Sequence, residues 1–237
     1  MDKIENMICK SASLKAMETT EDDIAKINQY TLSPLTAEDV FVFKAMLADN
    51  EQDDRNYEPF NLKSIEDLAK LYVGKAVMMN HREDQCGRVF DTEIVKSNTV
   101  TELGEQHAEL IAKIYIPITD KNQKLIDDIK YGILKEVSTN CTPAKVVCNI
   151  CGKDNMESYC CHWEGRKYVV GNEKVTCKML IDGVEEAYEV SFVPIPAQPR
   201  AGVCKAKKEK IEKDQSEIKA RIRLAEITNH KIKENDI

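Results

Sequence analysis

Apolar and polar residues alternate over several short stretches of the chain, and an alternation with a period of two predicts β-strands. The clearest stretch is 108–118, where one face is formed by Leu110, Ala112, Ile114 and Ile116. Further strands are predicted at 40–47, 76–79, 88–95, 134–139, 145–148, 167–170, 174–180 and 187–193. Two of these, 134–139 and 145–148, are predicted to pair with each other.

A period near 3.6 residues predicts amphipathic helices over 64–72 and 120–131. Thr20 precedes an acidic turn and an apolar run, which is typical of a short capped helix. Gly74 and Gly132 are expected to end the two longer helices, because glycine adopts the left-handed backbone at the lowest cost. Many short strands with three or four helices predict an α+β fold around one core.

Length and charge narrow the function classes. The chain has 237 residues, which allows one large domain or one domain with appendages. Its net charge of −7 argues against a dedicated nucleic-acid binder. No apolar run approaches the ~18–20 residues of a membrane span, and the N-terminus lacks the apolar core of a secretion signal. Neither membrane insertion nor secretion is therefore expected.

The charge is uneven along the chain. Residues 205–237 hold 10 Lys and Arg against 7 Asp and Glu, a net of +3, which leaves −10 for residues 1–204. A thin apolar stripe with spacings near seven runs through this tail and predicts a charged helix with a partner-binding seam, or equally a solvated helix or frayed tail. The predicted organisation is an N-terminal arm with a short helix (1–30), a main domain (31–204) and the tail.

Five potential metal ligands fall within 15 residues: Cys148, Cys151, Cys160, Cys161 and His162. Without a signal peptide, clustered cysteines more often bind metal than form disulfides. Tetrahedral zinc takes four sulfur or nitrogen ligands, so we predict a structural zinc site of Cys148, Cys151, Cys160 and His162, with Cys161 as the substitute for Cys160. This knuckle lies in an excursion over 148–172. Unrelated buried thiols and a redox Cys-x-x-Cys remain the alternatives.

Three further positions combine reactive side chains with strand ends or strand interiors. His81 follows the strand at 76–79, Ser138 lies in the strand at 134–139, and Glu189 is a carboxylate within the apolar strand at 187–193. Buried carboxylates are rare without a partner. Each residue taken singly also has an ordinary structural explanation.

Three blocks of sequence resemble the phage prohead proteases, the serine peptidases that trim scaffold and capsid proteins during head maturation. The blocks are Gly74–His81 followed by Gly87–Asp91, Gly132–Ser138, and Tyr188–Val203 with its Glu-x-Ser and Pro-Ala elements. The resemblance extends over about residues 25–204 and includes members from clostridial-type phages and prophages that carry a Cys-rich insertion.

The resemblance implies an assemblin-like fold, namely a small, largely antiparallel β-barrel with flanking helices. It also implies that Ser138 is the nucleophile, His81 the general base, and Glu189 the acid that orients the imidazole. Thr139, through its backbone N–H, and Asn140, through its amide, are the candidate oxyanion donors, because the residues after Ser138 depart from the pattern of the family. No cofactor is expected for catalysis.

The expected partners are phage scaffolding protein and major capsid protein as substrates, with self-cleavage and self-association as further expectations. The expected location is the host bacterial cytoplasm, inside the assembling prohead. Three alternatives stay open: a cysteine protease that uses Cys141 with His81, a non-catalytic capsid-assembly module of the same fold, and a zinc-dependent regulatory protein.

Overall fold

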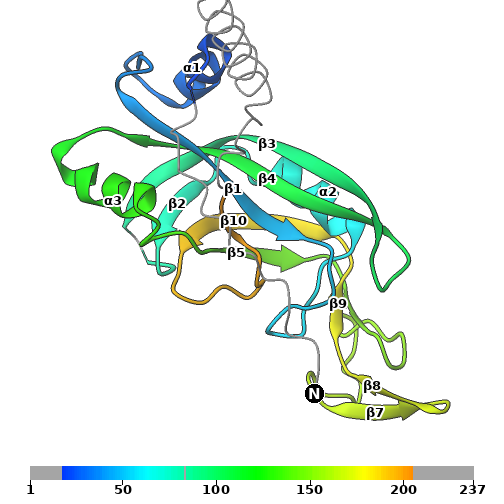
Figure 1. Cartoon of the computed structure of the whole chain (residues 1–237). Coiled ribbons are helices and arrows are strands. Elements are labelled where there is room, and N and C mark those ends of the chain that lie inside the picture. Colours follow the sequence, from blue (N-terminus) through cyan, green and yellow to red (C-terminus); the bar gives the residue numbers. More distant parts are fainter. Residues whose placement is uncertain (1–17, 83, 205–237) are drawn as a thin grey trace, which may run out of the picture. The chain divides into compact units, whose positions relative to one another are not determined.

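The computed structural model describes residues 18–82 and 84–204 (Figure 1). The predicted helix in the tail 205–237 lies outside the described residues. The described part combines three α-helices and a short 3-10 helix with one large sheet and two small ones, so the α+β prediction is confirmed. No helix in this part is both long and apolar enough to cross a membrane.

The large sheet has seven strands in the order β11-β1-β4-β3-β2-β10-β5. Their bounds are β1 (Val40–Asp49), β2 (Ala76–Met79), β3 (Gln85–Val100), β4 (Gln106–Pro117), β5 (Val137–Pro143), β10 (Val184–Phe192) and β11 (Gly202–Val203). All neighbouring pairs are antiparallel except β2 and β10, which run parallel. This parallel pair places the end of β2 beside the end of β10.

The sheet is curled into a half-barrel, and a fully closed barrel is not observed among the described residues. Its two edge strands, β5 and β11, approach each other at a single bridge between Glu136 and Gly202. Beyond that bridge the chain offers no further strand to pair with the outer edge of β5 in the described part. The expected antiparallel character is therefore confirmed for most strands, and the described residues show a half-barrel in which β5 and β11 meet only around this bridge.

The core lies on the concave side of this sheet. The predicted apolar face of β4 is completely buried, with Leu110, Ala112, Ile114 and Ile116 each at 0% exposure. The helix α2 (Leu62–Leu71) contributes Ile65 and Leu68 to the same core. Each of the two long helices begins at a side-chain cap, since Asn61 accepts from the N–H of Ser64 and Thr119 from that of Asn122.

The opposite face of β4 is also partly covered. Tyr115 packs with Ile27, Val40, Val42 and Phe90 in a second, smaller core. Ile27 ends the capped helix α1 (Glu21–Ile27), which is followed by the 3-10 helix Asn28–Tyr30.

The third helix, α3 (Asp120–Lys130), buries Ile126 and Ile129. Gly132 follows its C-cap Tyr131 with φ of +74°, as predicted. Gly74 also has a positive φ of +85°, but it lies two residues beyond Tyr72, the C-cap of α2. Gly132 therefore ends α3 as predicted, whereas Gly74 serves the turn that follows α2.

The predicted pairing of 134–139 with 145–148 is wrong. The first of these segments becomes β5, which pairs with β10, and the second becomes β6 (Val146–Cys148), which pairs with β9 (Met179–Ile181). The reason is that Ala144 and Lys145 bond to the segment around Gly183 rather than closing a hairpin. The chain therefore leaves the large sheet at this point.

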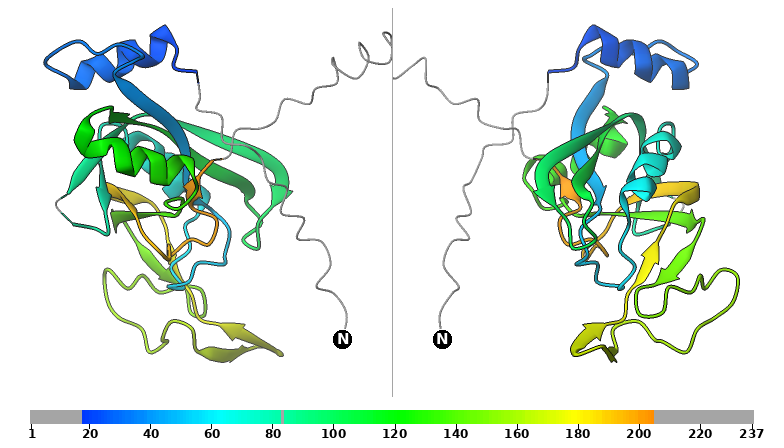
Figure 2. Two further views of the ribbon diagram at one scale, coloured as in Figure 1. Left: turned by 60° about the vertical axis from the view of Figure 1, so that its left-hand side comes forward. Right: turned by 90° about the vertical axis from the view of Figure 1, so that its right-hand side faces the viewer.

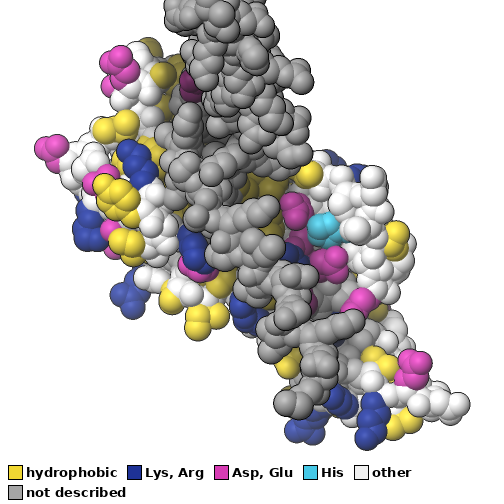
Figure 3. Space-filling view, viewed as in Figure 1, with side chains coloured by type: hydrophobic (Ala, Val, Ile, Leu, Met, Phe, Trp, Pro, Cys, Tyr) yellow, Lys and Arg dark blue, Asp and Glu magenta, His cyan; other side chains and the backbone are white. Residues whose placement is uncertain are grey.

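The excursion continues from β6 into a hairpin of β7 (Lys167–Val170) and β8 (Glu173–Thr176). In both views of Figure 2 this hairpin lies at the end of the described structure opposite α1. On the face shown in Figure 3, basic side chains gather at the same end, and exposed Lys167 and Lys174 come from these two strands.

Candidate active site and metal centre

His81 lies in the turn directly after β2. Asn80 and His81 both adopt the left-handed backbone, with φ of 52° and 54°, a conformation that is uncommon for residues other than glycine. Two bonds to β10 hold this turn: Asn80 donates its N–H to the carbonyl of Phe192 (2.9 Å), and His81 donates its N–H to Ser191 Oγ (2.9 Å). The strained turn is thus fastened to the neighbouring strand.

Glu189 lies on β10 and meets the imidazole of His81. The distance between His81 Nδ1 and Glu189 Oε1 is 2.6 Å, and the side chain of Glu189 is 7% exposed against 41% for His81. An ionised carboxylate only accepts hydrogen bonds, so this contact assigns the proton to Nδ1 and leaves Nε2 free. The pair thus has the arrangement of an oriented general base.

Ser138 lies on β5, directly opposite Ser191 of β10. Directly opposed residues of an antiparallel pair project to the same face, with Cβ atoms about 4.5–5.5 Å apart. Ser138 therefore shares the face of Ser191 and of Glu189, whose partner on β5 is Asn140. Ser191 is the direct neighbour of Ser138 on one side and the hydrogen-bond partner of His81 on the other.

No hydrogen bond joins Ser138 to His81 in residues 18–82 and 84–204. The structure thus brings the His81–Glu189 pair into contact and places Ser138 on the same face as Glu189. Catalytic hydrogen bonds are often long in enzymes without bound substrate and tighten when substrate binds.

The two candidate oxyanion donors occupy different sides of β5. The N–H of Val137 points away from β10, where it donates to the carbonyl of Ala201. Because N–H groups alternate along a strand, the N–H of Thr139 points to the same open edge. The side chain of Asn140 lies two residues from Ser138, on the same face of β5, and is exposed. Of the two candidates, only the backbone N–H of Thr139 points to the edge that borders the cavity.

Cys141, the alternative nucleophile, lies on the opposite face of β5 from Ser138 because it is three residues further along the strand. Burial raises the pKa of its thiol to about 11. A thiol that stays protonated at neutral pH is a weak nucleophile. The geometry therefore favours Ser138 over Cys141.

Ser191 was not predicted as a site residue. It is completely buried, yet it makes the hydrogen bond that positions His81. Its signal in the sequence is the spacing Glu189-x-Ser191, because residues two apart on a strand share a face. Both therefore face the His81 turn.

The predicted zinc ligands come together. The ligand atoms of Cys148, Cys151, Cys160 and His162 all lie within 4.8 Å of one another. Zinc–sulfur bonds of about 2.3 Å in a tetrahedron place two sulfurs about 3.8 Å apart. A small contraction of the cluster would therefore enclose an ion. Cys161, the predicted substitute, is exposed and lies outside the cluster.

The local chain explains how these four residues converge. Gly152, with φ of +72°, donates its N–H to the carbonyl of Cys148 and closes the knuckle. Asn155 accepts the N–H of Cys160 (2.8 Å), and the ring of Tyr168 meets the His162 ring edge-on. Burial raises the pKa of Cys148 to about 12 in the metal-free chain, so metal binding would release its proton. This donor set fits zinc.

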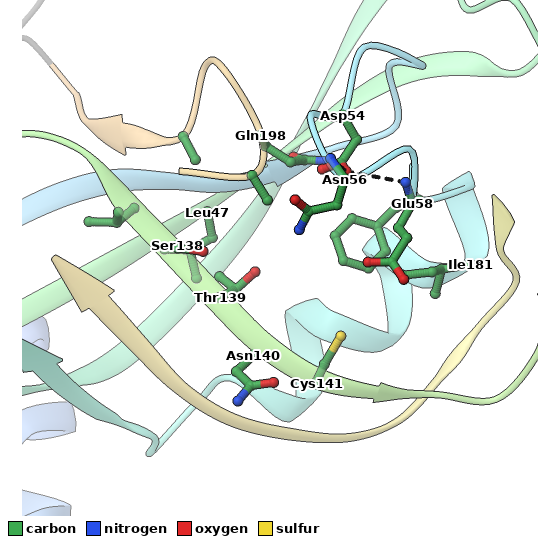
Figure 4. A pocket seen from close by; sticks show the side chains of 14 residues that line it. Leu47, Asp54, Asn56, Glu58, Ser138, Thr139, Asn140, Cys141, Ile181 and Gln198 are labelled. Carbon is green, nitrogen blue, oxygen red and sulfur yellow. Dashed lines mark hydrogen bonds between the residues drawn. The ribbon is translucent and has the colours of Figure 1, made fainter. Parts of the chain in front are cut away.

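A cavity of about 200 Å³ lies beside the open edge of β5 (Figure 4). Its walls come from β5, from the loop after β1 and from the segment after β10. The lining residues are Leu47, Asp54, Asn56, Glu58, Phe60, Val137, Ser138, Thr139, Asn140, Cys141, Ile181, Ala197, Gln198 and Ala201. Ser138 thus contributes both to the His81 face of the sheet and to the wall of a cavity.

Comparisons with known proteins give no match: no family model, no curated protein and no solved structure is similar to this chain. The function is therefore argued from the geometry of the chain itself.

Proposed function

We propose that the chain is a serine endopeptidase that matures viral capsids, with scaffolding protein and major capsid protein as its substrates. The observation that carries the proposal is the contact between His81 Nδ1 and Glu189 Oε1 (2.6 Å) on the face of the sheet that also carries Ser138. The residue types and their roles agree with the resemblance to phage prohead proteases in the blocks around His81, Ser138 and Glu189. An assemblin-like fold is part of this proposal.

In the proposed mechanism Ser138 Oγ attacks the scissile carbonyl carbon while Nε2 of His81 takes the hydroxyl proton. Glu189 holds the imidazole in the tautomer with Nδ1 protonated and stabilises the imidazolium. Because Glu189 is almost fully buried, its attraction to the imidazolium is only weakly screened. The N–H of Thr139 donates to the developing oxyanion, a contact typically worth about 10²–10³ in rate.

Collapse of the tetrahedral intermediate breaks the peptide C–N bond, and His81 returns the proton to the leaving amine. A water molecule then attacks the acyl ester on Ser138, again with His81 as the base. This leaves the free carboxyl product and restores the serine hydroxyl. The chemistry requires no metal at this face of the sheet.

The metal centre has a structural role in this proposal. Cys148, Cys151, Cys160 and His162 would hold a zinc ion that fastens the excursion between β6 and β9. The buried core of this excursion is small: Cys148, Cys177 and Met179, with four partly buried residues packed against them. Zinc sites with four protein ligands have no open position for a substrate and act by stabilising the fold.

Co-expression with candidate substrates tests the proposal. Wild-type chain and the Ser138→Ala variant would each be expressed with the scaffolding and capsid proteins of a phage that encodes this chain, and the products analysed by mass spectrometry. We expect defined internal cleavages with the wild type and none with the variant. A non-catalytic capsid-assembly module, which the missing Ser138–His81 hydrogen bond favours in the described residues, predicts intact proteins in both samples.

A further inference from the structure

The cavity beside Ser138 has a mixed lining, in which apolar side chains stand beside two carboxylates and several neutral polar groups. Leu47, Phe60 and Ile181 supply the apolar surface, and Asp54 and Glu58 supply the carboxylates. Lysine and arginine side chains match such a lining, because each has an apolar stem and a positively charged head. The lining is thus complementary to a basic side chain.

Asp54 carries an unused acceptor in this cavity. The residue is only 7% exposed. Its Oδ1 accepts the N–H groups of Asn56 (2.8 Å) and Glu58 (3.2 Å), whereas Oδ2 has no hydrogen-bond donor within the described part of the chain. Oδ2 is not fully enclosed, because Thr101 Oγ1 is the one completely buried side-chain oxygen or nitrogen without a partner in the described residues. It is therefore accessible to a donor placed in the cavity that Asp54 lines.

Glu58 adds a second unpaired charge. Neither Glu58 nor Asp54 forms an ion pair with any lysine or arginine placed by the structure. Glu58 is exposed, so it stands at the rim of the cavity; partial desolvation, together with the negative charges of Asp54 and Glu164, raises its pKa. A cation placed between these carboxylates would relieve their repulsion.

The edge of β5 provides the second half of the site. Thr139 directs its N–H and C=O toward the cavity side, where no strand pairs with β5 in the described residues. An extended peptide can add to such an edge through main-chain hydrogen bonds, and pockets along the edge then select its side chains. The edge and the cavity meet at Ser138 and Thr139.

We propose that a substrate peptide adds as a strand to the free edge of β5 and inserts a lysine or arginine side chain into the cavity, within two positions of the scissile bond. The inference rests on the proposed peptidase function and names its substrate class. Leu47, Phe60 and Ile181 contact the aliphatic stem, and Asp54 Oδ2 and Glu58 accept from the charged head.

A peptide library tests the proposal. The purified full-length chain would be incubated with a proteome-derived peptide library, and the sequences around each cleavage read by mass spectrometry. We expect basic residues to be enriched about tenfold or more at one position, since a hydrogen bond to a charged group corresponds to roughly 10–100-fold in selectivity. Glu58→Gln and Asp54→Asn, which keep the shape and the acceptors of the loop, are each expected to reduce that enrichment about tenfold.

Glu51→Gln is the matched control, because Glu51 lies in the same loop but does not line the cavity; it should leave the enrichment unchanged. Cleavage with no basic preference, or with a preference unaffected by Glu58→Gln and Asp54→Asn, would overturn the inference and leave the peptidase function intact. No cleavage beyond that of Ser138→Ala would overturn both.

Discussion

His81 donates its backbone N–H to Ser191 Oγ over 2.9 Å, and Ser191 stands directly opposite Ser138 in the sheet. One buried serine thus connects the turn that carries the imidazole to the strand that carries the proposed nucleophile. The imidazole itself is held by Glu189 two residues earlier on the same strand. Both ends of His81, main chain and ring, are positioned by β10.

Ser191→Ala is expected to lower kcat of peptide cleavage about tenfold with little change in KM. The substitution removes the acceptor that holds the His81 turn, at a typical cost of about 1–3 kcal/mol for an unpaired buried group, whereas the cavity and the β5 edge stay intact. Steady-state kinetics on one cleaved peptide measure the two constants. A fall in kcat accompanied by an equal rise in KM, or a change in KM alone, would argue against a positioning role.

Glu189→Gln is expected to reduce kcat by about 10²–10⁴, because an amide in this position no longer fixes the tautomer of His81 or stabilises its charged form. The matched control is Glu186→Gln, since Glu186 lies on the same strand and is exposed. The control should retain wild-type kinetics. If both variants lose activity to the same extent, the loss reflects damage to β10 rather than to the proposed catalytic pair.

Cys160→Ser is expected to abolish zinc binding, whereas Cys161→Ser retains about one zinc per chain. The structure separates these adjacent cysteines, because only Cys160 joins Cys148, Cys151 and His162. Metal analysis after purification measures the content. Removal of the metal with a chelator should increase proteolytic nicking within 148–182 while peptide cleavage continues. Equal zinc content in the two variants would contradict the ligand assignment.

Asp23→Asn is expected to lower the free energy of unfolding by about 1–2 kcal/mol at pH 7. Asp23 is 1% exposed and accepts from Lys113 Nζ (2.8 Å). Burial alone would raise its pKa, but bonds to Lys113 and Thr20 lower it overall. A lowered folded-state pKa stabilises the fold above the unfolded value of about 3.9 and loses that effect as the pH falls through the folded value.

The difference between the wild type and Asp23→Asn should therefore shrink below about pH 4, as urea unfolding at several pH values would measure. Asp22→Asn serves as the control, because Asp22 is largely exposed and, within residues 18–82 and 84–204, pairs only with Lys26 of the same helix. A constant difference at all pH values would contradict the ionised carboxylate of Asp23 as the source of the stabilisation.

Elements that depend on local pattern were predictable from the sequence. The strand 76–79 was predicted with the bounds of β2, and the predicted helix 120–131 differs from α3 by one residue. The convergence of the four candidate metal ligands was also predictable, because they lie close together in the sequence. In these cases residues that are close together in the sequence are sufficient to predict the feature.

Elements that depend on distant partners were harder to predict. The exposed, polar end of β3 extends to Val100 only because it pairs with β4. The predicted strand 174–180 divides into β8 and β9, since Cys177 donates its N–H to Arg166 whereas Met179 bonds to Tyr57. The role of Ser191 follows from a parallel pairing of β2 with β10 that no local pattern reveals.

The central claim is that His81 activates Ser138, and covalent labelling with a fluorophosphonate tests it most directly. The probe phosphonylates an activated serine: the Oγ–P bond forms, fluoride leaves, and the base takes the hydroxyl proton. The full-length chain, His81→Ala and Ser138→Ala would be treated and the adduct mapped by peptide mass spectrometry. We predict one adduct on Ser138 in the wild type and none in either variant. No adduct on Ser138, or equal labelling of Ser138 in the His81→Ala variant, would contradict the account.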